Sequence, residues 1–272
     1  MDIYEEITAF YKNATLQKTV FGKSLFHRNL YALKIGDGSP VGLAQYAIHG
    51  REWITAKLAM HHYFTGVKGT LWLVPLVNPD GALLSQRGLQ SVGNPCARAR
   101  LKQLCPNEAF FLWKANGRGV DLNVNFDARF GQGVKNVRVA GAENYVGKRA
   151  FSEPETQALK RFTLKVRPDY TVSYHTKGEE IYWYFYQSPS DCARDLYLAN
   201  ILSQSTGYPL AQAKGSAGGY KDWCIQRLKI PSFTVEVGKD AFTHPLDESA
   251  LQDIIEKNGD ALRRLSKGYS LL

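Results

Sequence analysis

The amino-acid sequence predicts a single α/β domain, with a largely parallel or mixed sheet covered by helices on both faces. Runs typical of buried strands alternate along the chain with runs that have helical spacing. The length of 272 residues fits one large domain. No linker-like segment and no internal repeat divides the chain, so we assign residues 1–272 to one domain.

The runs that we interpret as strands are short and apolar, which is typical of strands covered on both faces. They span residues 30–35, 42–48, 70–77, 170–175, 181–186 and 233–237. The runs with helical spacing span residues 3–11, 54–64, 153–166, 192–205, 220–228 and 247–266. Ser152, with Glu155 three residues on, predicts a capping box at the third helix. Residues 85–147 are rich in Gly, Asn and Arg, show few regular runs, and are too long to be an idle connection.

The composition favours a globular protein that acts on a small anionic molecule. Hydrophobic residues make up 44% of the chain, and the formal net charge is +9. The positive charge is scattered without a basic run, so we expect no nucleic acid partner; a generally basic surface is the simpler alternative. No run approaches about 18 apolar residues, so we expect no membrane insertion. The acidic start predicts no secretory signal and a cytoplasmic location with reduced cysteines, unless the chain has been trimmed.

Polar side chains gather where the predicted strands end. In open α/β sheets, ligands bind outside the carboxyl ends of the strands. His49 and Glu52 follow one strand, Asn78-Pro-Asp-Gly81 follows another, His175 closes a third, and Glu236 lies in the last. These positions are therefore candidates for a shared site.

His49 and Glu52 can reach one small cation, and a distant third ligand would complete a zinc site with an open position. Alone, the pair is equally consistent with a surface His and Glu that start a helix. His175 could supply the third ligand or be a satisfied core histidine. Glu236 lies in an apolar strand, where a carboxylate needs a partner or a task. It is either a general base for water or half of a buried ion pair.

Together these residues resemble the zinc carboxypeptidase family of metallopeptidases. The matching pieces are His49-Gly-Arg-Glu52-Trp53, Asn78-Pro-Asp-Gly81, Gly119-Val-Asp-Leu-Asn123, His175, and Gly218-Gly219 followed by Phe233-Thr-Val-Glu236. The resemblance implies one Zn²⁺ ion on His49, Glu52 and His175, with Glu236 as the base that activates water. It also implies the family fold, a mixed, mostly parallel sheet of about eight strands between helices.

The resemblance also suggests residues for the oxyanion and the substrate. An Arg after a Trp stabilises the oxyanion in the family, and Trp113-Lys114 is the counterpart here. Lys114 is therefore the expected residue, with Arg118 as the alternative. Arg51 lies between two ligands and either faces the substrate or pairs with an acidic neighbour on the surface.

The chain departs from the family at positions that determine specificity. Val124 replaces the Arg that clamps a free C-terminal carboxylate, and valine cannot supply a guanidinium fork. Asn123 can still donate a hydrogen bond. Lys221 falls at the base of the specificity pocket, where it either binds an anionic side chain or is a solvated lysine. Lys214 replaces a mobile Tyr, for which candidates are Tyr182, Tyr184 and Tyr220.

Residues 174–183 and 215–223 resemble the bacterial branch that cleaves γ-D-glutamyl–meso-diaminopimelate bonds. We therefore expect a zinc peptidase that acts on a small anionic peptide from the peptidoglycan stem, with Tyr220 and Lys221 among its substrate-binding residues. Three alternatives stay open: a carboxypeptidase for acidic C-termini, a related amidohydrolase of N-acyl amino acids, and a peptide-binding relative without catalysis. The oligomeric state is not indicated.

Overall fold

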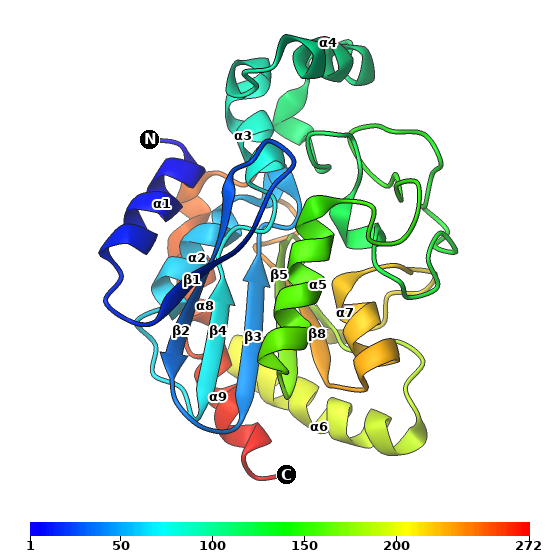
Figure 1. The fold of residues 1–272 in the computed structure, drawn as a ribbon. Coiled ribbons are helices and arrows are strands. Elements are labelled where there is room, and N and C mark those ends of the chain that lie inside the picture. Colours follow the sequence, from blue (N-terminus) through cyan, green and yellow to red (C-terminus); the bar gives the residue numbers. More distant parts are fainter.

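An eight-stranded mixed sheet forms the centre of the fold (Figure 1). The computed structural model describes residues 1–272. The strand order is β1-β2-β4-β3-β5-β8-β6-β7, with β4, β3, β5 and β8 running parallel in the middle. Nearer the edges, the pairs β1–β2, β2–β4 and β6–β8 are antiparallel, whereas the edge strand β7 pairs parallel with β6. The predicted fold class is confirmed.

The strands are β1 (Lys18–Lys23), β2 (Asn29–Gly36), β3 (Val41–Tyr46), β4 (Thr70–Val74), β5 (Tyr170–Thr176), β6 (Glu180–Tyr182), β7 (Leu210–Ala211) and β8 (Ser232–Val237). The sequence did not predict β1 and β7. Strand β1 is partly exposed and contains polar residues, and β7 has only two residues, so neither gives an apolar run. Strand β3 ends earlier than expected because Ala47 adopts a positive φ of 48°.

The helices are α1 (Ile3–Asn13), α2 (Ile54–His62), α3 (Pro79–Arg87), α4 (Pro95–Leu104), α5 (Pro154–Val166), α6 (Pro189–Thr206), α7 (Tyr220–Trp223), α8 (Leu251–Asn258) and α9 (Ala261–Tyr269). The helix predicted at 247–266 is two helices. The sequence also missed α3 and α4, although both begin with an Asn cap followed by Pro, which is a start signal. No helix has the length and apolar character needed to cross a membrane.

The capping box predicted for α5 is wrong. Glu153, not Ser152, is the N-cap residue of α5, and Pro154 occupies the first turn. The Ser152 hydroxyl donates to Glu153 Oε1 at 2.7 Å. Glu155 instead accepts a hydrogen bond from the Leu25 N–H at 2.7 Å, so its carboxylate joins α5 to the segment before β2.

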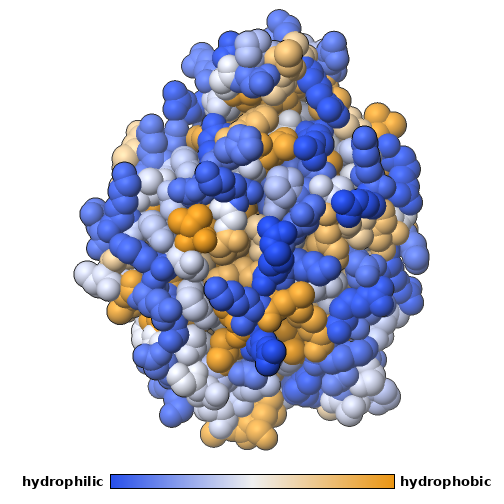
Figure 2. Space-filling view, in the orientation of Figure 1, coloured by the Kyte–Doolittle hydropathy of each residue, from blue (hydrophilic) through white to orange (hydrophobic).

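Helices cover both faces of the sheet. One face packs against α1, α2, α6, α8 and α9, and the other packs against α5 and α7. Leu43 and Ala44, which are consecutive in β3, belong to the two opposite cores, as alternating side chains in a strand must. The outer surface in Figure 2 is mostly hydrophilic, with apolar side chains in scattered groups.

The parallel register brings the ends of three central strands to one edge. Tyr46 in β3 is opposite Tyr174 in β5, and His175 in β5 is opposite Glu236 in β8. The chain leaves β3 three residues before His49. The predicted polar residues therefore meet at one edge of the sheet.

We expect Asp80→Ala to lower the free energy of unfolding by about 3 kcal/mol, because it breaks a buried ion pair. Asp80 is fully buried; it accepts from Ser24 Oγ at 2.8 Å and the Phe26 N–H at 2.8 Å, and it pairs with Arg28 at 2.6 Å. Urea unfolding measures the change. Asp37→Ala is the control, because the Asp37 side chain is 89% exposed. Equal destabilisation by the two variants would contradict the prediction.

Candidate metal centre and active site

Three buried side chains converge at the edge of the sheet. His49 follows β3, Glu52 ends the short 3-10 turn Gly50–Glu52, and His175 lies near the end of β5. His175 Nδ1 is 3.1 Å from His49 Nδ1 and 2.9 Å from Glu52 Oε2, and His49 Nδ1 is 2.8 Å from Glu52 Oε1. One ligand atom from each residue lies within 4.8 Å of the others. The structure therefore brings the three predicted ligands together.

The charges in this cluster suit a cation. Burial disfavours the Glu52 carboxylate, but His49 and His175 outweigh burial and hold the pKa of Glu52 well below its usual range. The two facing imidazole nitrogens can both turn a lone pair towards one cation beside the Glu52 carboxylate. Nitrogen and carboxylate donors in this number are what zinc takes in a catalytic site, where a fourth position stays open.

Asp121 orients one of these ligands. Its Oδ1 lies 3.3 Å from His49 Nε2, the nitrogen that faces away from the cluster. Burial opposes ionisation of Asp121, but Lys114 and His49 outweigh burial and hold its pKa well below the usual range. A carboxylate behind a ligand histidine fixes the ring and its tautomer. Asp80, the carboxylate of the Asn78-Pro-Asp-Gly81 motif, pairs with Arg28 instead and contacts none of the three ligands.

Glu236 faces the same cluster from β8. Burial, together with the charge of Glu52, raises the pKa of Glu236 to about 7, while His175 and Lys114 oppose the rise. A carboxyl group with a pKa near neutrality can both accept and return a proton. The alternative of a buried ion pair does not hold, because the nearby Lys114 pairs with Asp121 at 3.1 Å.

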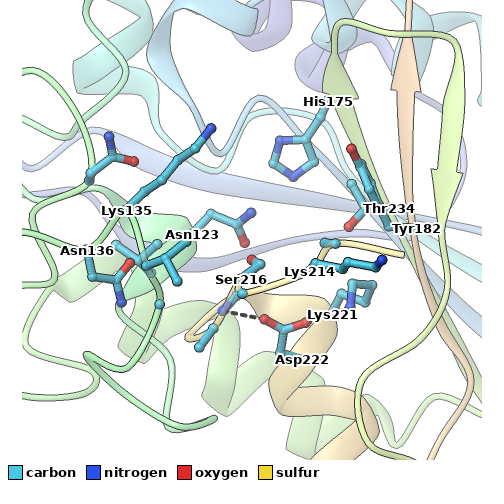
Figure 3. A pocket seen from close by; sticks show the side chains of 18 of the residues that line it. Asn123, Lys135, Asn136, His175, Tyr182, Lys214, Ser216, Lys221, Asp222 and Thr234 are labelled. Carbon is cyan, nitrogen blue, oxygen red and sulfur yellow. Dashed lines mark hydrogen bonds and ion pairs between the residues drawn. The ribbon is translucent and has the colours of Figure 1, made fainter. Parts of the chain in front are cut away.

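A cavity of about 420 Å³ opens onto this cluster (Figure 3). Its lining combines His49, His175 and Glu236 with side chains from distant segments, so two of the three residues of the cluster face the cavity. Four lysines also line it, and two carboxylates, Asp222 and Glu236, oppose them. The lysines are Lys114, Lys135, Lys214 and Lys221. The cavity is therefore a positively charged space beside a metal-binding cluster.

Comparison with known proteins identifies the family. The model of the zinc carboxypeptidase family matches residues 3–261. The chain belongs to the zinc carboxypeptidase family. The predicted resemblance is confirmed, and the metal of this family is zinc, which the three converging side chains fit.

Two relatives of this chain carry names that state what they cleave. Gamma-D-glutamyl-L-diamino acid endopeptidase 1 of Lysinibacillus sphaericus is 32% identical over 267 residues, which cover 89% of this chain and 65% of the relative. Murein peptide amidase A of Escherichia coli K12 is 32% identical over 135 residues, which cover 45% of this chain and 50% of the relative. The chain thus spans less than two thirds of the length of these relatives.

Solved structures show the same fold. Bovine thrombin-activatable fibrinolysis inhibitor, in complex with a tick carboxypeptidase inhibitor, superposes with a TM-score of 0.80 at 19% identity, over 100% of this chain and 98% of that chain. Murein-tripeptide amidase from Escherichia coli O157 superposes with a TM-score of 0.59 at 22% identity, over 96% and 94% of the two chains. At these sequence identities, the two solved structures show that this chain shares their fold and nothing more.

Zinc held by His49, Glu52 and His175 would supply a Lewis acid for a substrate carbonyl and lower the pKa of a nearby water. Side chains around the three ligands would supply proton transfer and stabilisation of the oxyanion. Burial disfavours the Lys114 ammonium, yet Asp121 and Glu52 raise its pKa, so it stays charged. A fixed cation at the cavity wall can stabilise an oxyanion.

The cavity lining contains Lys114, predicted to stabilise the oxyanion, and two predicted substrate residues, Asn123 and Lys221. Asn123 Oδ1 accepts from the Tyr220 N–H at 3.0 Å, which leaves the Asn123 amide NH₂ as a donor (Figure 3). The Lys221 side chain is buried, so it is not the solvated lysine of the alternative reading. The catalytic roles of these residues stay predictions.

Three other predicted substrate residues lie outside the cavity lining. Tyr220 is fully buried, and its hydroxyl is 2.9 Å from Thr163 Oγ1. Arg118 pairs with Glu153 at 3.0 Å and lines a different cavity. Arg51 Nη1 is 3.4 Å from Glu143 Oε2, which matches the alternative of a surface ion pair. These three side chains therefore do not line the cavity, and their contacts with a substrate stay predictions.

Sequence reasoning missed Lys135 and Asp222. Lys135 lies within the irregular segment 85–147, where no periodicity singles out a residue. The structure places it against residues 212–217, since the Val134 N–H donates to Gly215 O at 2.9 Å. Asp222 has a local signal, because its carboxylate accepts from the Gly219 N–H at 3.2 Å and so closes the first turn of α7.

We expect Asp121→Asn to weaken zinc binding by about 10- to 100-fold, because His49 loses its charged partner while the amide keeps an acceptor oxygen. Competition with a chromophoric chelator measures the change. The matched control is Asp127→Asn, since Asp127 is exposed and pairs with Arg227 at 3.0 Å. Equal zinc affinity in the two variants would remove the orienting role of Asp121.

Proposed function

We propose that this protein hydrolyses the amide bond between a γ-linked D-glutamyl residue and diaminopimelate in peptides derived from peptidoglycan. The observation that carries the proposal is the charge of the cavity beside the metal cluster, where Lys135 and Lys214 have no ion-pair partner and Lys114 and Lys221 each pair with a carboxylate. Such a peptide is rich in anions, since the γ-linked glutamyl residue keeps its α-carboxylate and diaminopimelate carries two carboxylates. Opposite charges raise the local concentration of the substrate and orient it.

The missing clamp supports a substrate other than an ordinary protein C-terminus. Val124 lines the cavity where the family supplies an arginine, and no arginine lines the cavity. The remaining donor there is the Asn123 amide. A single amide gives a weaker hold on a carboxylate than a bidentate guanidinium, because it is uncharged and not forked.

In the proposed reaction Glu236 takes a proton from the attacking water and passes it to the leaving amine. Burial, which raises the pKa of Glu236 above its ordinary value, favours return of the proton after it has been taken up. Lys114 holds its ammonium group at the cavity wall through Asp121 and would face the oxyanion. The name of the Lysinibacillus sphaericus relative supports the same bond type.

A carboxypeptidase for acidic C-termini is the second candidate, favoured by Lys221 in the cavity. It would use the same metal ligands and base, so only substrates separate the two functions. The cytoplasmic location and the origin of the substrate in peptidoglycan stem peptides stay predictions.

We expect the zinc-loaded protein to release diaminopimelate from L-Ala-γ-D-Glu-meso-diaminopimelate, because its carboxylates match the lysines of the cavity. Amino-acid analysis of the products measures release. The control is an α-linked peptide that ends in glutamate. Turnover of the α-linked control without release of diaminopimelate would favour the second candidate.

We expect Glu236→Gln to lower kcat by about 10²- to 10⁴-fold, because the amide cannot accept the proton of water. Zinc content, measured on the same samples, should not change, since Glu236 is not one of the three converging ligands. Glu256→Gln, on the exposed face of α8, is the control. Activity of the Glu236 variant equal to that of the control would exclude Glu236 as the base.

A further inference from the structure

We propose that Lys221 and Asp222 together form a subsite for a side chain that ends in both a carboxylate and an ammonium group. The far end of diaminopimelate is such a group. This inference rests on the proposed function and extends it, because Lys221 alone would select only for an anion.

The two residues form a pre-built ion pair inside the cavity. They are consecutive on α7, and Lys221 Nζ is 2.6 Å from Asp222 Oδ1. Their side chains are only 8% and 3% exposed, and both line the cavity that holds Glu236 (Figure 3). A molecule in the cavity therefore meets both charges at once.

The protein holds each partner in place and leaves capacity for a ligand. Lys221 Nζ also donates to Tyr184 O at 3.2 Å, which leaves one of its three N–H groups. Asp222 Oδ2 accepts from the Gly219 N–H at 3.2 Å, and a carboxylate has about four acceptor sites. The Lys221 ammonium lies 5.3 Å from the centre of the Phe185 ring. One donor and two acceptor positions remain for an occupant.

The charges of the pair decide which side chain fits. A lone carboxylate would gain Lys221 but meet the negative charge of Asp222. A lone ammonium would gain Asp222 but meet the positive charge of Lys221. An uncharged side chain would displace water from both groups and replace none of its hydrogen bonds. A side chain with both charges satisfies both partners.

The other cavity lysines differ from Lys221. Lys135 and Lys214 are exposed and form no ion pair within the chain, so their full charge is available to carboxylates. Lys135 and Lys214 can therefore pair with the substrate carboxylates that the Lys221–Asp222 subsite does not bind. The Lys221–Asp222 pair has no net charge, so its contribution is selectivity rather than attraction.

The test compares three peptides, L-Ala-γ-D-Glu-X, with the zinc-loaded protein. X is meso-diaminopimelate, 2-aminopimelate, which lacks the second amino group, or lysine, which lacks the second carboxylate. We expect kcat/KM for diaminopimelate to exceed both others by about tenfold or more, the size of one charged hydrogen bond. Equal values for diaminopimelate and 2-aminopimelate would overturn the subsite.

Two variants assign the preference to the two residues. Asp222→Asn should reduce the diaminopimelate to 2-aminopimelate ratio of kcat/KM towards one, and Lys221→Gln should reduce the diaminopimelate to lysine ratio. Each ratio is measured within one protein sample, so partial loss of folded protein cancels. Asp127→Asn is the matched control. Unchanged ratios in both variants would mean that the pair is only structural, and would overturn the inference.

The same three peptides distinguish failure of the proposed function from failure of the Lys221–Asp222 subsite. If none of the three γ-linked peptides is cleaved, while an α-linked peptide is, the proposed function fails and the subsite fails with it. If all three are cleaved at similar rates, the proposed function holds and only the Lys221–Asp222 subsite is excluded.

Discussion

The buried carboxylate of Asp121 is the interaction on which the site depends. It is fully buried and contacts His49 Nε2 at 3.3 Å and Lys114 Nζ at 3.1 Å. It also accepts from the N–H groups of Asn123 and Asn144, at 3.0 and 3.1 Å. One group thus sets the position of a metal ligand, a cation on the cavity wall and two segments of the cavity. A buried charge is costly unless partners surround it, so loss of any of these four contacts leaves the others with a less stable carboxylate.

A second constraint is the close approach of two motif segments. A Cβ on Gly50 would lie 2.4 Å from the backbone of Gly81, so only glycine fits between the metal-ligand turn and α3. Asn78 caps α3 through the Gly81 N–H at 2.9 Å, and its amide donates to Ile48 O at 3.2 Å and to Ala115 O at 3.1 Å. The glycines and the asparagine of the two motifs therefore have a packing role: they bring the ends of β3 and β4 and the Lys114 segment into one unit.

The sequence could predict the metal cluster because its signals are local to strand ends. His49, His175 and Glu236 follow or lie in apolar runs, and parallel strands must bring such ends to one edge. The directions in which side chains point from short helices could not be predicted in the same way. Tyr220 and Lys221 are adjacent, yet the Tyr220 ring is buried in the core and the Lys221 side chain lines the cavity. The sequence does not predict this difference, because α7 has too few residues to show a periodic face. Lys135 reaches the site only through the contact of Val134 with Gly215, which links residues far apart in the sequence.

The lysines of the cavity are of two kinds: two pair with a carboxylate and two do not. Lys114 and Lys221 are each paired with a buried carboxylate, and such groups need little rearrangement when a substrate binds. Lys135 and Lys214 lie on loops without a carboxylate partner. In the proposed function, these two exposed lysines attract the substrate, while Lys114 and Lys221, held by Asp121 and Asp222, serve chemistry and selectivity. This separation lets the loops change substrate affinity without disturbing the geometry around His49 and Glu236, because no loop lysine contributes to the metal cluster.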